Sequence, residues 1–246
     1  MLKPILVLVT APVCYVLYRS LGRSFFARRR GHDKPGHDDL DASSRIVSTI
    51  HALVVVSTGA ATVLMHSPSD FNQANGLEPR LGALGLCVSV GYFVYDLRVL
   101  AEIGFNPLVP VLLHHSLCAL CMGLIAASVP RAVWYACLLQ CTEATVPLQT
   151  AVFFLERRGH QHDQQSGGPT LAYAAARWGL LLLWLMVREL LFAYFAFVVW
   201  RDWDGLTLEM KALGWGTGVP LTVFNTGGLV AHVLPGWPWC KRTKRS

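Results

Sequence analysis

The feature that most restricts how this chain can fold is a series of apolar segments, most of them about as long as a membrane-spanning helix. Seven such segments are at about residues 4–21, 46–66, 81–101, 108–129, 132–155, 171–200 and 211–235. A helix of ~20 apolar residues crosses the ~30 Å hydrocarbon core of a bilayer and satisfies its own backbone hydrogen bonds. The sequence therefore predicts an all-α fold, a polytopic membrane helical bundle of about seven transmembrane helices.

The composition and the placement of charge agree with a membrane protein. Of the 246 residues, 53% are hydrophobic and 15% are charged, whereas roughly 25% are charged in an ordinary soluble domain. The net charge of +6 comes from basic residues at the ends of apolar segments, where they meet anionic lipid headgroups. Nucleic acid is not an expected partner, because no basic face interleaved with aromatic residues is present. Membrane lipids are the expected partners.

The distribution of Lys and Arg predicts the orientation in the membrane. Seven of the 21 basic residues lie between Arg19 and Arg45, Arg157 and Arg158 follow the fifth segment, and a basic tail begins at Lys241. By the positive-inside rule, these regions are cytosolic and the N-terminus is lumenal or outside. The tail KRTKRS loosely resembles an endoplasmic reticulum retrieval signal. We therefore expect an endomembrane, the endoplasmic reticulum above all, rather than the plasma membrane.

The first segment admits one alternative, a cleaved signal peptide, since Lys3 gives it a basic start. The main basic cluster follows the segment instead of preceding it, and no small-residue cleavage site is evident. These features favour a retained first helix.

Ionisable residues inside the apolar segments are the most informative functional signal. Intramembrane charges usually face the bundle interior and mark functional sites. On the predicted orientation His51, Asp96, His114 and His115 all fall in the cytosolic half of the membrane. Further polar groups in or next to these segments are Arg45, Tyr92, Glu143 and Arg188. Two interpretations remain open, a polar network that joins helices and a lined cavity that faces the cytosol and accepts a lipid or acyl chain.

Other chemistries fit these residues less well. His114, His115, Cys118 and Cys121 include the ligand types that zinc prefers, but one helix cannot readily place four ligands tetrahedrally around an ion, so we expect no metal. A di-iron desaturase would need more histidines, and transmembrane haem would need histidine pairs at two depths. A seven-span receptor or transporter has no signal beyond the number of segments.

Several motifs, in this order, give the chain a family resemblance. They are Ser44-Arg45 with Ser48 and His51, Gly91-Tyr92 with Asp96, the pair His114-His115, and Glu143 with Thr145 and Pro147. Together they resemble the TLC-domain family, which includes the ceramide synthases and smaller proteins of lipid homeostasis. The expected organisation is an N-terminal transmembrane helix with a basic cytosolic loop (1–39), a TLC domain of six helices (40–235) and a basic cytosolic tail (236–246).

The resemblance implies two hypotheses about function. One is ceramide synthase-like transfer of an acyl group to a lipid amine, with acyl-CoA as co-substrate and no cofactor. The other is a non-catalytic, lipid-binding regulator of membrane phospholipid composition. Where ceramide synthases carry an acidic motif resembling His-Asp-x-Ser-Asp, this chain has the single carboxylate of Glu143, which brings it closer to the smaller family members.

The two hypotheses share one set of site residues. The catalytic candidates are His114 and His115, with Asp96 orienting one imidazole, and the substrate-binding candidates are Arg45, His51, Tyr92, Glu143 and Arg188. Adjacent helical residues diverge by ~100°, so the two histidines are expected to have different roles. Glu143 and Arg188 are expected to be partnered near mid-depth, because an unpaired charge there is costly.

Overall fold

A computed structural model describes residues 2–27, 35–71, 80–103, 108–162 and 171–233, and within these residues the chain forms helices and short turns only. The expected all-α class is confirmed for this part of the chain. The predicted tail (236–246) and the segments around Asn75 and residues 163–170 lie outside the described residues. The helices are α1 (Leu2–Leu21), α2 (His37–Met65), α3 (Arg80–Ile103), α4 (Leu108–Ser128), α5 (Val133–Gln140), α6 (Val146–His162), α7 (Leu171–Trp184), α8 (Leu191–Arg201) and α9 (Leu208–Val233).

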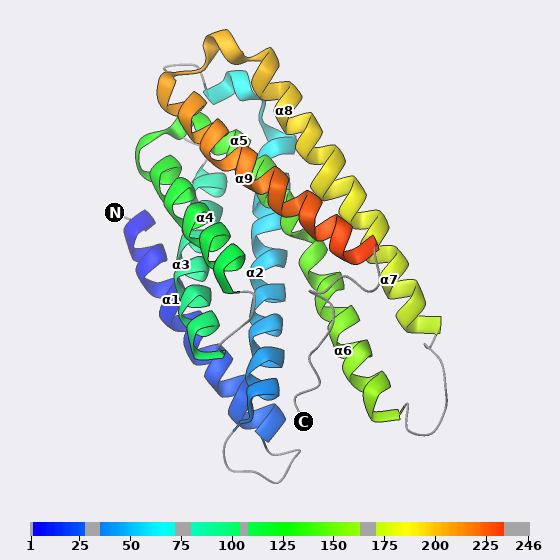
Figure 1. The fold of residues 1–246 in the computed structure, drawn as a ribbon. Coiled ribbons are helices and arrows are strands. Elements are labelled where there is room, and N and C mark those ends of the chain that lie inside the picture. The colour runs from blue at the N-terminus through cyan, green and yellow to red at the C-terminus, as the bar shows by residue number, and fades with distance from the viewer. Residues whose placement is uncertain (1, 28–34, 72–79, 104–107, 163–170, 234–246) are drawn as a thin grey trace.

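Two pairs of these helices are joined by short irregular helical turns into longer rods. A 3₁₀ turn, η5 (Cys141–Thr145), connects α5 to α6, and a π-helical turn, η6 (Leu185–Leu190), connects α7 to α8. The turn η5 ends two residues before Pro147, whose ring nitrogen cannot donate the backbone hydrogen bond of a regular helix. Figure 1 shows α2, α3, α4 and the two rods running alternately toward opposite ends of the bundle, with α9 passing obliquely in front of α5 and converging on the α7–α8 rod.

Four helical segments are long and apolar enough to cross a membrane. They are His37–Met65, Arg80–Glu102, Val111–Ser128 and the α7–α8 rod, Leu171–Arg201. The chain is therefore an integral membrane protein, while the predicted number of seven spans stays a prediction. The fifth apolar segment, for example, is divided between α5 and α6, so that neither helix alone reaches the length of a span.

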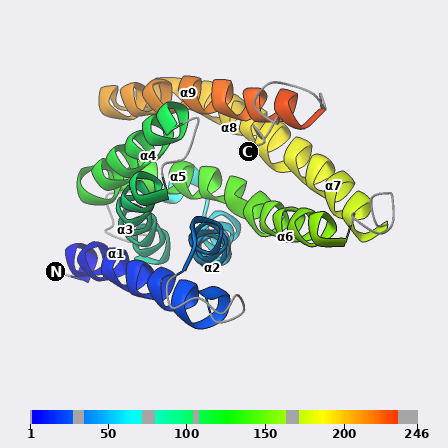
Figure 2. The same cartoon turned by 60° about the horizontal axis from the view of Figure 1, so that its bottom comes forward.

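Helix α2 occupies the centre of one half of the bundle. Seen from the end where α2 begins (Figure 2), it lies among α1, α3 and the α5–α6 rod, with α8 and α9 on the far side of α5. Glycines permit the closest approaches between helices. A Cβ on Gly59 of α2 would meet the carbonyl oxygen of Cys137 at 2.8 Å, and one on Gly91 of α3 would meet Thr10 of α1 at 2.6 Å. Small residues at such contacts are typical of membrane helix packing.

Polar contacts tie the helices together at the ends of the bundle. Arg157 of α6 donates to the Asp38 carbonyl oxygen (2.8 Å) and to Oδ1 of Asp39 (3.3 Å) at the start of α2. At the opposite end, Tyr135 of α5 donates to Oδ2 of Asp202, just after α8, at 2.8 Å. A hydrogen bond from Arg201 lowers the pKa of Asp202, so this carboxylate is ionised at neutral pH.

Two details of the helices differ from the sequence-based expectation. Helix α2 begins at His37, well before the apolar segment at 46, because Asp39 accepts a hydrogen bond from the Gly36 amide and Arg45 pairs with Asp41 one turn earlier. Helix α9 continues through Pro220, although a proline inside a helix usually kinks or breaks it.

Candidate functional site

A cavity lies among α4, α5, η5, η6, α8 and α9. Most of its lining is apolar, with Ile125, Tyr135 and Leu213 as examples. The polar side chains that reach it belong to His114, Gln140, Thr142, Glu143, Arg188, Thr217 and Asn225. An apolar cavity with a few converging polar groups is the usual form of a site for a hydrophobic ligand.

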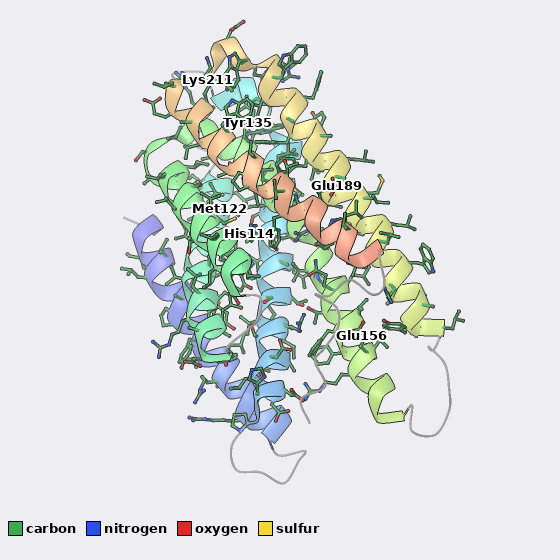
Figure 3. All side chains as sticks on the ribbon, in the orientation of Figure 1. His114, Met122, Tyr135, Glu156, Glu189 and Lys211 are labelled. Atoms are coloured by element: carbon green, nitrogen blue, oxygen red, sulfur yellow. The ribbon has the colours of Figure 1, made fainter. Side chains whose placement is uncertain are left out.

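The cavity has a polar end and an apolar end. His114, Arg188 and Asn225 lie at the polar end, near mid-depth of the bundle, and the lining continues past Met122 to Leu206 and Met210 where α8 meets α9. Figure 3 shows the same progression, with His114 near the middle and Tyr135 and Lys211 toward the α8–α9 end. The cavity was expected to face the cytosol. On the charge-derived orientation its apolar part extends instead toward the lumenal end.

His114 is the histidine that lines the cavity. Its ring stacks on Phe224 of α9 with the centroids 4.3 Å apart, and its Nδ1 lies 3.8 Å from the Cys118 sulfur one turn along α4. The sulfur contact is the one polar contact of this imidazole within the described part of the chain. Its ring nitrogens are therefore available to a molecule that enters the cavity.

His115 points away from the cavity toward α3. Its Nδ1 lies 2.8 Å from Oδ2 of Asp96, and its ring packs beside Phe93 at 5.2 Å. The carboxylate oxygen is close to Nδ1 but is not aligned for a hydrogen bond. The rings of the two histidines are 5.3 Å apart, so Asp96 and His115 lie directly behind His114. The predicted divergence of the pair is observed.

Arg188 brings a buried positive charge to the cavity wall. It lies in the π-helical turn η6, and only 7% of the residue is exposed. Its Nε donates to Oγ1 of Thr145 at 2.9 Å, and a terminal nitrogen donates to Oδ1 of Asn225 at 3.1 Å. The guanidinium also lies over the Trp184 ring, 4.6 Å from its centroid. Both hydrogen-bond acceptors of Arg188 are neutral. The π-helical turn that carries it is a feature that often occurs at functional sites.

Glu143 lines the cavity together with Arg188, and its charge attracts the guanidinium. The expected pairing is electrostatic and not a direct bond, because within the described residues Arg188 forms no ion pair with a carboxylate inside 4.0 Å. Glu189 is the next residue along the chain and also forms no ion pair with Arg188 among the described residues. Its Oε1 has no hydrogen-bond partner among them.

Three of the predicted substrate-binding residues lie outside the cavity. His51 and Tyr92 stack face to face with centroids 3.8 Å apart, and the Tyr92 hydroxyl is 2.7 Å from Oγ of Ser48. Ser89 lies 3.2 Å from Nε2 of His51 and accepts a hydrogen bond from Gln140 at 2.8 Å. These five residues form a polar cluster that joins α2, α3 and α5, with Gln140 reaching both the cluster and the cavity.

The third, Arg45, lies near the start of α2. It pairs with Asp41 at 3.1 Å, and its guanidinium lies over the Phe153 ring of α6 at 4.1 Å. Its observed contacts join α2 to α6.

Comparison with known proteins identifies the family. The model of the TLC domain matches residues 41–240 of this chain, which is most of its length. The chain belongs to the TLC-domain family. No curated protein and no solved structure matches the sequence significantly.

The TLC domain contains every helix that lines the cavity, as well as Asp96 and the paired histidines. The protein is thus a membrane protein of a lipid-related family with a polar-ended apolar cavity inside its family domain. Among the described residues, no group of three or more His, Cys, Asp or Glu side chains could hold a metal ion.

Several lining residues of this TLC domain were not among the sequence-predicted site. Of the two residues that accept hydrogen bonds from Arg188, Asn225 lines the cavity and was not predicted, and Thr145 was named only as part of a family motif. The apolar lining from α8, α9 and the turn between them, such as Phe195, Leu206 and Met210, carries no sequence signal that separates it from lipid-facing residues.

Proposed function

We propose that this TLC-domain protein holds the acyl chain of a lipid in the cavity and transfers an acyl group at His114 from acyl-CoA to a lipid amine. The observation that carries the proposal is the position of His114, an imidazole at the boundary between the polar and apolar parts of one cavity. Such a boundary is where the carbonyl of an acyl chain would lie if its hydrocarbon filled the apolar part.

The chemistry needs a group that accepts a proton near neutral pH. The unprotonated ring nitrogen of a neutral imidazole accepts a proton, so His114 can take the proton of an amine as the amine nitrogen attacks the thioester carbonyl. The carbon–nitrogen bond forms, the carbon–sulfur bond breaks, and the CoA thiolate leaves with the proton. His114 can alternatively act as the nucleophile, carrying the acyl group as an acyl-imidazole before the amine accepts it.

Asp96 and His115 act behind His114 in this proposal. The buried Asp96 carboxylate lies 2.8 Å from Nδ1 of His115 and positions that ring, and the adjacent His115 ring helps hold His114 against Phe224. The two histidines therefore have separate roles, one in chemistry and one in positioning.

The predicted membrane orientation agrees with this reaction. His114 lies ~9 Å of helix from Leu108 at the start of α4, at ~1.5 Å per residue. This end of α4 is the one that the positive-inside rule places in the cytosol, the compartment of acyl-CoA. The acyl chain would then extend from His114 toward the opposite end. An endomembrane such as the endoplasmic reticulum is the proposed location.

A second candidate function is non-catalytic lipid binding that adjusts phospholipid composition. The contact between Asp96 and His115 favours it, because the carboxylate that would fix the tautomer of an imidazole base touches the histidine outside the cavity. The same cavity serves both candidates, and they differ in the role of His114.

Purified protein incubated with acyl-CoA and lipid amines separates the two candidates. We expect wild type to form the acylated lipid, His114→Gln to form none, and His115→Gln to retain a reduced rate. Thermal stability and binding of a radiolabelled fatty acid serve as controls for folding. Retention of lipid binding together with absence of product in wild type and both variants would favour the non-catalytic function. Unchanged product formation by folded His114→Gln would overturn the catalytic role of this residue.

A further inference from the structure

We infer that the lipid bound in this cavity carries an anionic oxygen group, a carboxylate or a phosphate, which binds Arg188. The inference rests on the proposed function, because it assumes that the cavity holds a lipid. It adds the chemical class of the polar end of that ligand.

The guanidinium of Arg188 uses only some of its hydrogen-bond donors within the protein. Arginine carries five N–H donors and cannot lose its charge in a protein. Thr145 and Asn225 accept from two of these donors, at 2.9 and 3.1 Å. Within the described residues no carboxylate contacts the guanidinium, and the side chain faces the cavity. Donors therefore remain available to a ligand.

The position of the Arg188 charge inside the bundle costs free energy. A charged side chain at the centre of a membrane helix costs roughly 2.5–3.5 kcal/mol on insertion scales. Neutral acceptors hold the group in place without neutralising it, and the nearest acidic lining residue, Glu143, acts on it only from beyond ion-pair distance. An anion that enters the cavity can supply the missing counter-charge through two parallel charge-assisted hydrogen bonds.

Arg188 lies at one end of the apolar lining of the cavity. About 20 Å of helix separates Arg188 from Arg201, at ~1.5 Å per residue; cavity residues Phe195 and Val199 lie along that distance, and Leu206 lies just beyond it. A ligand with its anionic group at Arg188 can therefore extend a hydrocarbon chain toward the α8–α9 end. For the acyl transfer proposed above, a lipid amine that also carries a phosphate therefore fits the cavity better than one whose only charge is an ammonium, because Arg188 would repel the ammonium.

The test compares single-chain lipids that differ only in the polar end. Binding to purified wild type in nanodiscs is measured for a long-chain fatty acid, its methyl ester, the amine of equal length, a lysophosphatidic acid and the matching monoacylglycerol, each corrected for empty nanodiscs. Wild type should bind the carboxylate or the phosphate about tenfold or more tightly than the matching neutral lipid, as expected for a hydrogen bond to a charged group. The amine should bind most weakly. Preference for the phosphate identifies a phospholipid headgroup, and preference for the carboxylate alone identifies a fatty acid.

Two variants assign the preference to Arg188. Arg188→Met should reduce it to less than about twofold. Asn225→Asp should do the same while keeping the arginine, because the new carboxylate would neutralise the guanidinium. Arg177→Met, which removes an exposed charge from α7 of the same rod, is the matched control and should keep the full preference.

The outcomes separate this inference from the proposed function. Equal binding of charged and neutral lipids by wild type would overturn the anionic ligand while leaving the lipid cavity in place. Persistence of the preference in both folded variants would overturn the role of Arg188. Failure of every lipid to bind wild type would overturn the proposed function itself.

Discussion

Filling the cavity from its wall should shorten the acyl chain that the protein accepts, and Gly214 offers the position. This glycine of α9 lines the cavity, and a Cβ built on it has no heavy atom within 4 Å. Gly214→Leu therefore adds a side chain of four carbons at a position whose Cβ meets open space. Gly216, two residues later, is exposed and equally free of neighbours, so Gly216→Leu makes the same change of residue type on another face of the helix.

The magnitude follows from the volume exchanged. The leucine side chain displaces about four methylene groups of a bound chain, each worth ~0.8 kcal/mol for transfer from water. A fatty acid whose chain fills the wild-type cavity should bind Gly214→Leu about 3 kcal/mol more weakly than wild type, with the dissolved monomer as the reference state. This is a factor on the order of 100 in affinity. Chains shorter by about four carbons should bind both proteins equally well. Both variants should be as stable as wild type or slightly more stable, since glycine costs about 1 kcal/mol in a helix interior.

The assay is competition by fatty acids of increasing length against a radiolabelled fatty acid on purified protein. The expected result is a shift of the optimum to shorter chains in Gly214→Leu and no shift in Gly216→Leu. An unchanged optimum in a stable Gly214→Leu protein would refute the assignment of the chain to this cavity. An equal loss in both variants would indicate a general effect of leucine in α9.

Three further predictions follow from the contacts and the charge pattern. Glu143→Gln should raise the affinity for an anionic lipid severalfold, because it removes a like charge from the same cavity; titration with a fatty acid measures this, and an equal rise for the methyl ester would contradict the charge argument. Tyr92→Phe should lower the free energy of unfolding by about 1 kcal/mol through loss of the hydrogen bond with Ser48, with the half-exposed Tyr194→Phe as control; equal melting temperatures for the two variants would contradict it. A glycosylation acceptor engineered near Asn75 should be modified and one at residues 160–168 should not, and the reverse pattern would invert the predicted orientation.

The sequence is sufficient to predict the helical class and the family, because both depend on local or ordered patterns. Long apolar segments have one stable form in a bilayer, and the motif residues from Ser44 to Pro147 keep their order whatever the packing. The different orientations of His114 and His115 also follow from helix geometry alone. These properties need no knowledge of which helices touch.

Which residues line the cavity depends on tertiary packing, and the sequence pattern alone could not predict it. His51 and Tyr92 share the predicted depth of His114, but their helix faces turn toward one another and toward Ser89, away from the cavity. The irregular turns η5 and η6 set the directions of Glu143 and Arg188, and periodicity cannot predict such turns. The direction of the cavity depends on how α9 packs against α4 and the α7–α8 rod, which no sequence pattern specifies.

Photo-crosslinking of a bound fatty acid tests most directly whether an acyl chain lies in the cavity with its polar end at Arg188 and His114. A fatty acid with a diazirine near its methyl end is bound to purified wild type and irradiated, and the labelled peptides are identified by mass spectrometry. The account predicts labelling of the apolar end, at Leu206, Met210 or Leu213, and its loss in Gly214→Leu but not in Gly216→Leu. Labelling confined to the exposed outer residues of the helices, such as Leu182 or Val223, unchanged in Gly214→Leu, would contradict it.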